Sequence, residues 1–396
     1  MKEINLVISK TASLIGTQFF SVFLSLWIVN NFSKASMLSL SLSLTSVVTI
    51  AFTLFGGVAS ASTKIIKNLC LLDLLSMIIC IFSAIMWLFE STSQLATYII
   101  LTVVNSVLSL NSSFSGPIFK KLTGVVVAKD KVLKYNEILS ASKEIVRLVV
   151  PTLASFMFAL GMINAFIALS INGFSFLASF ISLYNLGKYD IFPDNVQQSK
   201  GSHYREAITA LFKDKDNLKK FSNIFLLYIF IAGINILAPY YSVHVFKSSW
   251  LYGVLESSQS FGAILAVLTF KFYKVDISMR KERLGLVLSA ICMALVVPTQ
   301  SKALFIIGIA ILAYYYLRYN VAFESYMQLG FKNSFLGEIY SLYYGLISIA
   351  TLIGNTLIGA LGDYNANLCF LVTSVAIGLI NCSVLISLMG RKNESL

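Results

Sequence analysis

The apolar residues of this 396-residue chain gather in about a dozen separate runs, each long enough to cross a lipid bilayer. Hydrophobic residues make up 57% of the sequence and charged residues only 12%. A membrane-spanning helix needs roughly 20 mostly apolar residues to match a hydrocarbon core of about 30 Å. The runs recur at about that length between short polar breaks. The sequence therefore predicts an all-α membrane protein.

Twelve spans are expected, and the basic residues indicate their orientation. The spans begin near Ile4, Met37, Leu69, Leu95, Tyr135, Ile163, Phe221, Trp250, Leu284, Ala303, Phe335 and Leu368. When the loops between these spans are assigned alternately to the two sides of the membrane, 24 of the 30 Lys and Arg residues, Lys10 among them, fall on one side. Only Lys34, Lys247 and Lys302 fall on the other. Cytoplasmic loops carry the excess of basic residues in membrane proteins. Both termini are therefore expected on the cytoplasmic side of the membrane.

The longest polar segment divides the predicted spans into two sets of six. The expected domains are an N-terminal six-helix bundle over residues 1–186, a cytoplasmic central loop over 187–220 and a C-terminal six-helix bundle over 221–396. Four apolar residues of the loop recur at helical spacing: Tyr204, Ile208, Leu211 and Phe212. This pattern favours an amphipathic helix on the inner membrane surface. A solvated linker is the alternative.

Several function classes are disfavoured by the sequence. The net charge of +12 is explained by the topology signal, so nucleic acid is not an expected partner. The two histidines, His203 and His244, are predicted on opposite sides of the membrane, so a histidine metal site is not expected. No phosphate-binding loop and no catalytic constellation is found. We expect neither an enzyme nor a cofactor, and a monomer whose partners are the lipid bilayer and a small molecule.

Local patterns spread over nearly the whole chain carry a family resemblance. The eleventh span opens with Phe335-Leu336-Gly337-Glu338-Ile339-Tyr340-Ser341-Leu342 and continues to Ile353-Gly354, Gly359 and Asp363. Other matching positions are Ser13, Gly16, Pro117, Asn136, Pro151, Asn235, Pro239, Glu256, Phe261 and Gly262. These patterns resemble the drug:proton antiporter-3 branch of the major facilitator superfamily, which includes bacterial macrolide-efflux and enterobactin-exporter proteins.

The resemblance implies two six-helix bundles that rock about a solute site near the bilayer midplane, which gives alternating access. It also implies roles in gating or conformational change for Gly57, Lys64, Lys67, Pro151 and Gly337. Secondary transport is the activity that this plan implies, with protons as the coupling ion, and the plasma or inner membrane of a bacterial cell is the location that it implies.

The chain also departs from the family pattern. Where the family has Asp and Arg in the loop after the second span, Gly57 is followed by Ala61 and Ser62. Leu108 stands where proton-driven drug pumps place an arginine. These departures argue against proton coupling by the family's usual route, but they leave the fold unaffected.

Charged and polar residues inside the spans are the candidate site. A charge in a spanning helix costs roughly 2.5–3.5 kcal/mol on insertion scales, so each needs a partner or a wet cavity. Glu144 and Arg147 lie on one face of the fifth span, where they either line the inner half of the pathway or satisfy each other as an i, i+3 pair. The expected cavity residues are Gln18, Asn105, Glu144, Arg147, Asn235, Tyr315, Arg318 and Tyr319.

Arg318 stands among tyrosines in the tenth span. It either attracts an anionic solute group or has a structural role, held by cation–π contacts or by a pair with Glu144 or Glu324. Glu144, Glu256 and Glu324 are the candidate proton-coupling residues. For Glu256 the alternative is an interfacial carboxylate hydrated from outside.

The leading hypothesis is a proton-coupled exporter of an amphipathic, macrolide- or drug-like small molecule. One alternative is a dedicated exporter of an endogenous peptide or siderophore-like product, because Lys143, Arg147 and Arg318 suit an anionic cargo. The other is a transporter-derived receptor or immunity protein that binds without cycling, which the loss of Asp and Arg after Gly57 suggests.

Overall fold

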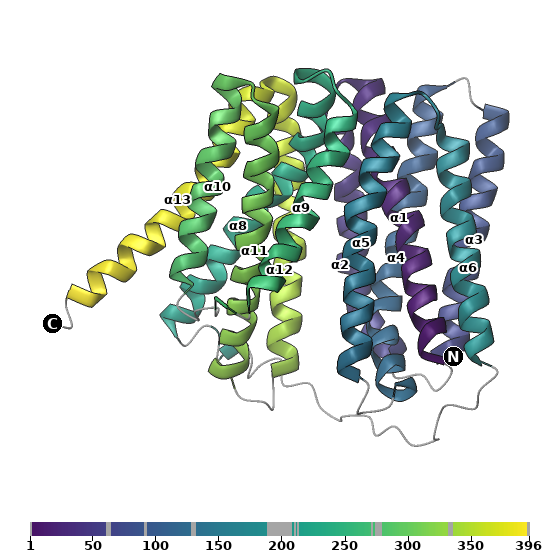
Figure 1. Ribbon diagram of the computed structural model, residues 1–396, viewed down its shortest axis with the longest axis horizontal. Coiled ribbons are helices and arrows are strands. Elements are labelled where there is room, and N and C mark those ends of the chain that lie inside the picture. The colour runs from purple at the N-terminus through teal and green to yellow at the C-terminus, as the bar shows by residue number, and fades with distance from the viewer. Residues whose placement is uncertain are drawn as a thin grey trace. The chain divides into compact units, whose positions relative to one another are not determined.

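The computed structural model describes residues 2–60, 65–90, 93–127, 132–187, 208–209, 211, 214–270, 272–273, 279–331 and 336–393. Its regular structure in these ranges consists of twelve α-helices and one π-helical segment (Figure 1). The predicted all-α fold with twelve helices is confirmed. Lys64 and most of the predicted amphipathic helix of the central loop lie outside the described residues.

The chain divides into two compact units. The first comprises Met1–Ser33, Ser41–Ser199 and Ser248–Gly253, and the second comprises Lys34–Leu40, Lys200–Lys247 and Val254–Leu396. The early helices of the chain are α1 (Lys2–Phe32), α2 (Ala35–Ser60), α3 (Ile65–Glu90), α4 (Gln94–Val126), α5 (Val132–Ala159) and α6 (Ala165–Gly187). The later ones are α8 (Lys215–Tyr240), the π-helical η2 (Tyr241–Val245), α9 (Trp250–Thr269), α10 (Arg280–Thr299), α11 (Lys302–Gly330), α12 (Leu336–Tyr364) and α13 (Ala366–Asn393).

Eleven of the helices in the described ranges are long and apolar enough to cross a membrane. The helix α5 is not among them, although its 28 residues would reach about 42 Å. Its composition is the reason, because it carries Lys143, Glu144 and Arg147 near its middle. The helix α5 is therefore long enough to span a membrane. Its charged side chains then need protein or water around them.

Some helices begin earlier than the apolar pattern predicts. The helix α8 begins at Lys215 rather than Phe221, and α10 begins at Arg280 rather than Leu284. At the start of α8 the Asp214 carboxylate accepts a hydrogen bond from the backbone amide of Asp216, at 2.9 Å, which caps the helix. A hydropathy pattern detects only the apolar part of a helix, so these polar first turns were expected as loop.

Small residues let helices pack closely in both units. A Cβ atom at Gly16 of α1 would lie 2.0 Å from the Ser175 hydroxyl oxygen of α6. In the second unit, a Cβ atom at Gly354 of α12 would lie 2.1 Å from the carbonyl oxygen of Ile229 in α8. Close backbone approach at glycine is a common way for helices to associate in a membrane. In the first unit it brings α1 and α6 together beside the site described next.

Candidate functional site

The first unit contains a cavity of about 370 Å³ between α1, α2, α4, α5 and α6. This volume lies at the lower end of the range for small-molecule sites, about 300–1,000 Å³. Most of its lining residues are polar, although the helices that form it are mainly apolar. Its hydroxyl-bearing residues are Ser13, Thr17, Thr45, Ser109, Ser112 and Ser115. Its apolar residues are Leu14, Phe20, Leu108 and Phe176.

Three cationic side chains line this cavity: Lys10 from α1, and Lys143 and Arg147 from α5. Lys143 and Arg147 are four residues apart and therefore share a face of the helix. Nη1 of Arg147 lies 3.1 Å from Oε1 of Glu144, while 49% of the Arg147 side chain stays exposed. The structure thus places Arg147 at the cavity and in an ion pair with Glu144 at the same time. Lys10, expected at the inner surface, instead lies within α1 on the cavity wall.

The hydroxyl groups of the lining donate mainly to their own helices. Five of them hydrogen-bond to backbone carbonyls three or four residues earlier: Ser13 to Lys10, Thr17 to Ser13, Thr45 to Ser41, Ser109 to Ser106 and Ser112 to Ser109. Asn105, one of the candidate residues, lines the cavity, and its amide donates to the Thr45 hydroxyl at 2.9 Å. Because their protons are donated to backbone carbonyls, these five hydroxyl groups face the cavity mainly as hydrogen-bond acceptors.

A buried carboxylate, Asp73 of α3, lies behind this wall. It accepts a hydrogen bond from the Ser179 hydroxyl of α6, and the Asn111 amide of α4 lies 3.4 Å from its Oδ1. Ser179 also shares a hydrogen bond of 2.8 Å with Ser9 of α1. Lys10 interacts with Asp73 electrostatically. Asp73 joins four helices of the first unit, and Asn111 connects it to the cavity.

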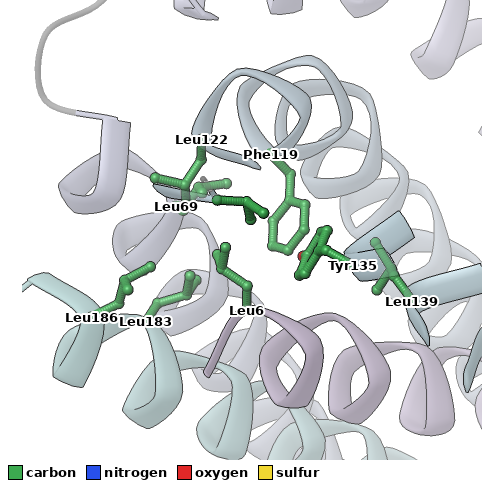
Figure 2. Close-up of a cluster of buried hydrophobic side chains, with 9 residues drawn as sticks. Leu6, Leu69, Phe119, Leu122, Tyr135, Leu139, Leu183 and Leu186 are labelled. Carbon is green, nitrogen blue, oxygen red and sulfur yellow. The ribbon is translucent and has the colours of Figure 1, made fainter. Parts of the chain in front are cut away.

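An apolar cluster lies one helical turn from the cavity residues on three helices. On α1 Leu6 precedes Lys10 by four residues, and on α5 Leu139 precedes Lys143 by four. On α4 Phe119 follows Ser115 by four residues. Figure 2 shows these apolar side chains pointing toward one another. The ammonium of Lys10 lies 5.2 Å from the centre of the Phe119 ring, so the cavity borders directly on this cluster.

The second unit has a smaller cavity of about 30 Å³, which Asn235 lines with Gln259 and Tyr316. One water molecule needs about 10–15 Å³ measured in this way, so the space suits water rather than an organic solute. Its eight lining residues are all uncharged. Asn235 was predicted in one solute cavity with Asn105 and Arg147, but the structure places it at this smaller cavity instead.

Arg318 lies in a fully buried ion pair of the second unit. Its Nη2 is 3.4 Å from Oε1 of Glu282 in α10 and donates to the carbonyl of Tyr273 at 2.8 Å. Its guanidinium also lies 4.8 Å from the centre of the Tyr273 ring. The carboxylate found beside Arg318 is thus Glu282, not the expected Glu144 or Glu324. Next to it, the buried Tyr319 hydroxyl accepts a hydrogen bond from Arg283 at 3.0 Å.

Four other candidates lie outside the two cavities. Tyr315 packs over Gly285 of α10, where an added Cβ would lie 2.1 Å from its ring. Glu324 accepts a hydrogen bond from the Tyr344 hydroxyl of α12 at 3.5 Å. Glu256 is half-buried in the second turn of α9, and Gln18 is half-buried in α1 outside the lining of the 370 Å³ cavity.

The residues expected to gate are placed as follows. Pro151 is buried in α5, with its carbonyl oxygen 2.3 Å from the position of a Cβ at Gly253. Lys67 is exposed in the first turn of α3. Gly57 lies in α2 and Gly337 in the first turn of α12. Lys64 lies outside the described residues.

The sequence matches no model of a known protein family and no curated protein. Its structure is similar to that of a bacterial homologue of the iron transporter ferroportin, with a TM-score of 0.77 and 16% identity over 98% of both chains. It is also similar to a mutant form of the nucleoside transporter NupG, with a TM-score of 0.73 and 12% identity over 98% of this chain and 99% of that one. A D-xylose–proton symporter matches with a TM-score of 0.71 and 14% identity over 97% and 96%. The chain therefore has the major facilitator fold.

Proposed function

We propose that this protein is a secondary active transporter that moves a small-molecule solute across a bacterial cell membrane by alternating access. The observation that carries the proposal is the 370 Å³ cavity, lined by three cationic and several hydroxyl-bearing side chains, among helices of membrane-spanning length. Charged side chains are costly in a membrane and are retained where they meet water, a partner or a solute. The fold supports the proposal, because the similar solved structures bear the names of transporters.

In this proposal the predicted bundles, residues 1–186 and 221–396, are the two moving halves, and both termini are cytoplasmic. A green fluorescent protein joined to the C-terminus should then fluoresce, whereas alkaline phosphatase joined there should be inactive. The opposite result would reverse the predicted orientation.

Export in exchange for protons is the finer form of the proposal. It is supported by the family resemblance of the eleventh span and by Glu144, Glu256 and Glu324, carboxylates within the helices. An amphipathic, macrolide- or drug-like cargo would place its apolar part against Phe20 and Phe176. The cationic lining favours the second version, a dedicated exporter of an endogenous peptide or siderophore-like product that carries negative charge.

An efflux panel in a pump-deficient bacterium tests the proposal. Cells that express the protein should accumulate at least one solute of a panel of lipophilic dyes, drugs and organic anions less than control cells do, and an uncoupler should abolish the difference. Purified protein in sealed vesicles should move the same solute only when a gradient is present. Binding without gradient-dependent movement would instead select a non-cycling receptor.

A further inference from the structure

We infer that the cavity of the first unit binds the anionic group of a small organic solute through Lys10, Lys143 and Arg147. This inference rests on the proposed transport function, because it names the class of solute that the transporter carries. The three cations come from α1 and α5 and reach the same cavity. Among the fifteen described residues that line it, none is Asp or Glu.

Two carboxylates that interact with these cations lie outside the cavity lining. Glu144 pairs with Arg147, and Asp73 interacts electrostatically with Lys10, but neither carboxylate lines the cavity. They compensate part of the charge of two cations without occupying the space between the helices. The cations therefore supply the charged surface that a solute meets.

The two lysines repel each other across this space, since Lys143 acts on Lys10 electrostatically. Charge interactions are much stronger between helices than in bulk water, because the effective dielectric constant is lower. An anion within reach of both ammonium groups relieves this repulsion and is attracted by each. A cationic solute would add to the repulsion.

Several hydroxyl groups of the lining are engaged within their own helices. The hydroxyl protons of Thr17, Ser109 and Ser112 are already donated to backbone carbonyls. Phe20 and Phe176 provide an apolar surface instead. The cavity thus combines cationic and apolar walls, a combination that suits an organic anion with an apolar part.

The charge preference can be measured without knowing the natural solute. In the full-length protein, Ser112→Cys introduces a thiol on the cavity wall, and Ser13→Cys provides a second one from α1. Each variant is treated with the anionic reagent sulfonatoethyl methanethiosulfonate or the cationic trimethylammonioethyl methanethiosulfonate. Peptide mass spectrometry measures modification at the introduced residue, which separates it from the five native cysteines. The modification rate measured for each reagent is divided by the rate of the same reagent with mercaptoethanol, so that the intrinsic reactivities of the two reagents cancel.

Gln94→Cys is the control, because Gln94 is exposed in the first turn of α4 and does not line the cavity. We expect the ratio of anionic to cationic rates at the first cavity to exceed that control by about tenfold or more, the effect of a cleft lined by charge of one sign. Lys10→Gln and Lys143→Gln should each lower the ratio, whereas Lys302→Gln, at the exposed start of α11, should not.

A ratio at or below that of Gln94→Cys overturns the inference, and so does a ratio that Lys10→Gln and Lys143→Gln leave unchanged. Failure of both reagents at both introduced thiols would also overturn it, because small organic ions would then not reach the cavity. Transport in the same preparations separates this inference from the proposed function. Gradient-dependent movement without anion preference refutes the inference alone, and anion preference without movement refutes transport alone.

Discussion

The side-chain amide of Asn111 lies 3.4 Å from Oδ1 of Asp73 and also lines the cavity of the first unit. The same amide donates to the Ser76 hydroxyl at 2.7 Å. Asn111 thus connects the buried carboxylate of Asp73 to the space that a solute would occupy. Its charge should influence that space.

Asp73→Asn should make the cavity more attractive to anions. The substitution removes a negative charge near Lys10 but keeps a side chain of the same size that can hydrogen-bond. In the Ser112→Cys protein, we expect the ratio of anionic to cationic labelling rates to rise several-fold. An unchanged ratio in a folded protein would show that Asp73 does not act on the cavity. Asp73→Ala, which also leaves polar partners unsatisfied, should lower stability by about 1–3 kcal/mol.

Breaking the buried pair of Arg318 and Glu282 should destabilise the second unit. Either Arg318→Met or Glu282→Gln leaves a buried charge uncompensated, which typically costs about 3–5 kcal/mol. The double variant should recover most of this loss, because neither charge of the pair remains. Thermal unfolding in detergent measures all three. The exposed pair of Arg147 and Glu144 is the comparison, where Glu144→Gln should cost less than about 1 kcal/mol. Equal losses at the two pairs would contradict this account.

Two glycines of α12 form a matched pair for testing helix packing. Gly354→Ala places a Cβ 2.1 Å from the backbone oxygen of Ile229, which cannot move aside without shifting α8. We expect a loss of about 1–3 kcal/mol from overpacking. Gly345→Ala meets nothing within 4 Å and should be neutral or stabilising. Both can be read from the unfolding temperature, and equal effects would argue against close contact of α8 and α12.

The proposed proton sites can be tested by removing each carboxylate's charge separately. Glu144→Gln, Glu256→Gln and Glu324→Gln keep side-chain size but cannot release a proton. For a solute identified by the efflux panel, we expect at least one of these variants to lose the dependence of transport on the pH gradient. The protein without substitutions, with and without uncoupler, defines the full effect. Unchanged pH dependence in all three variants would remove these residues from the coupling mechanism.

The sequence was sufficient to predict the helices, because an apolar run of membrane-spanning length has few other structures available to it. It also singled out Arg147 and Asn105, which line the cavity, because polar side chains in a span need protein or water around them. Lys10 was assigned to the inner surface because it stands near the start of the first run. The helix begins at Lys2, so Lys10 lies in its third turn.

The partners of buried charges were harder to predict. Glu282 precedes the apolar run that was expected to begin at Leu284, so it was treated as loop and not considered for Arg318. Asp73, a single carboxylate among leucines in α3, carried a usable signal, because an ionisable residue in a span is a candidate functional site by default. Which residues face it depends on how α1, α4 and α6 pack, and periodicity within one helix does not contain that information.

The most direct test of the central claim is gradient-dependent solute movement by the double variant Lys10→Gln/Lys143→Gln. The solute is one that cells expressing the unsubstituted protein export in an uncoupler-sensitive way, and Lys302→Gln is the control. If the cavity of the first unit holds the transported solute, the double variant should lose this movement while its amount in the membrane and its unfolding temperature stay close to those of the control. Movement at the control rate in the double variant would contradict the account.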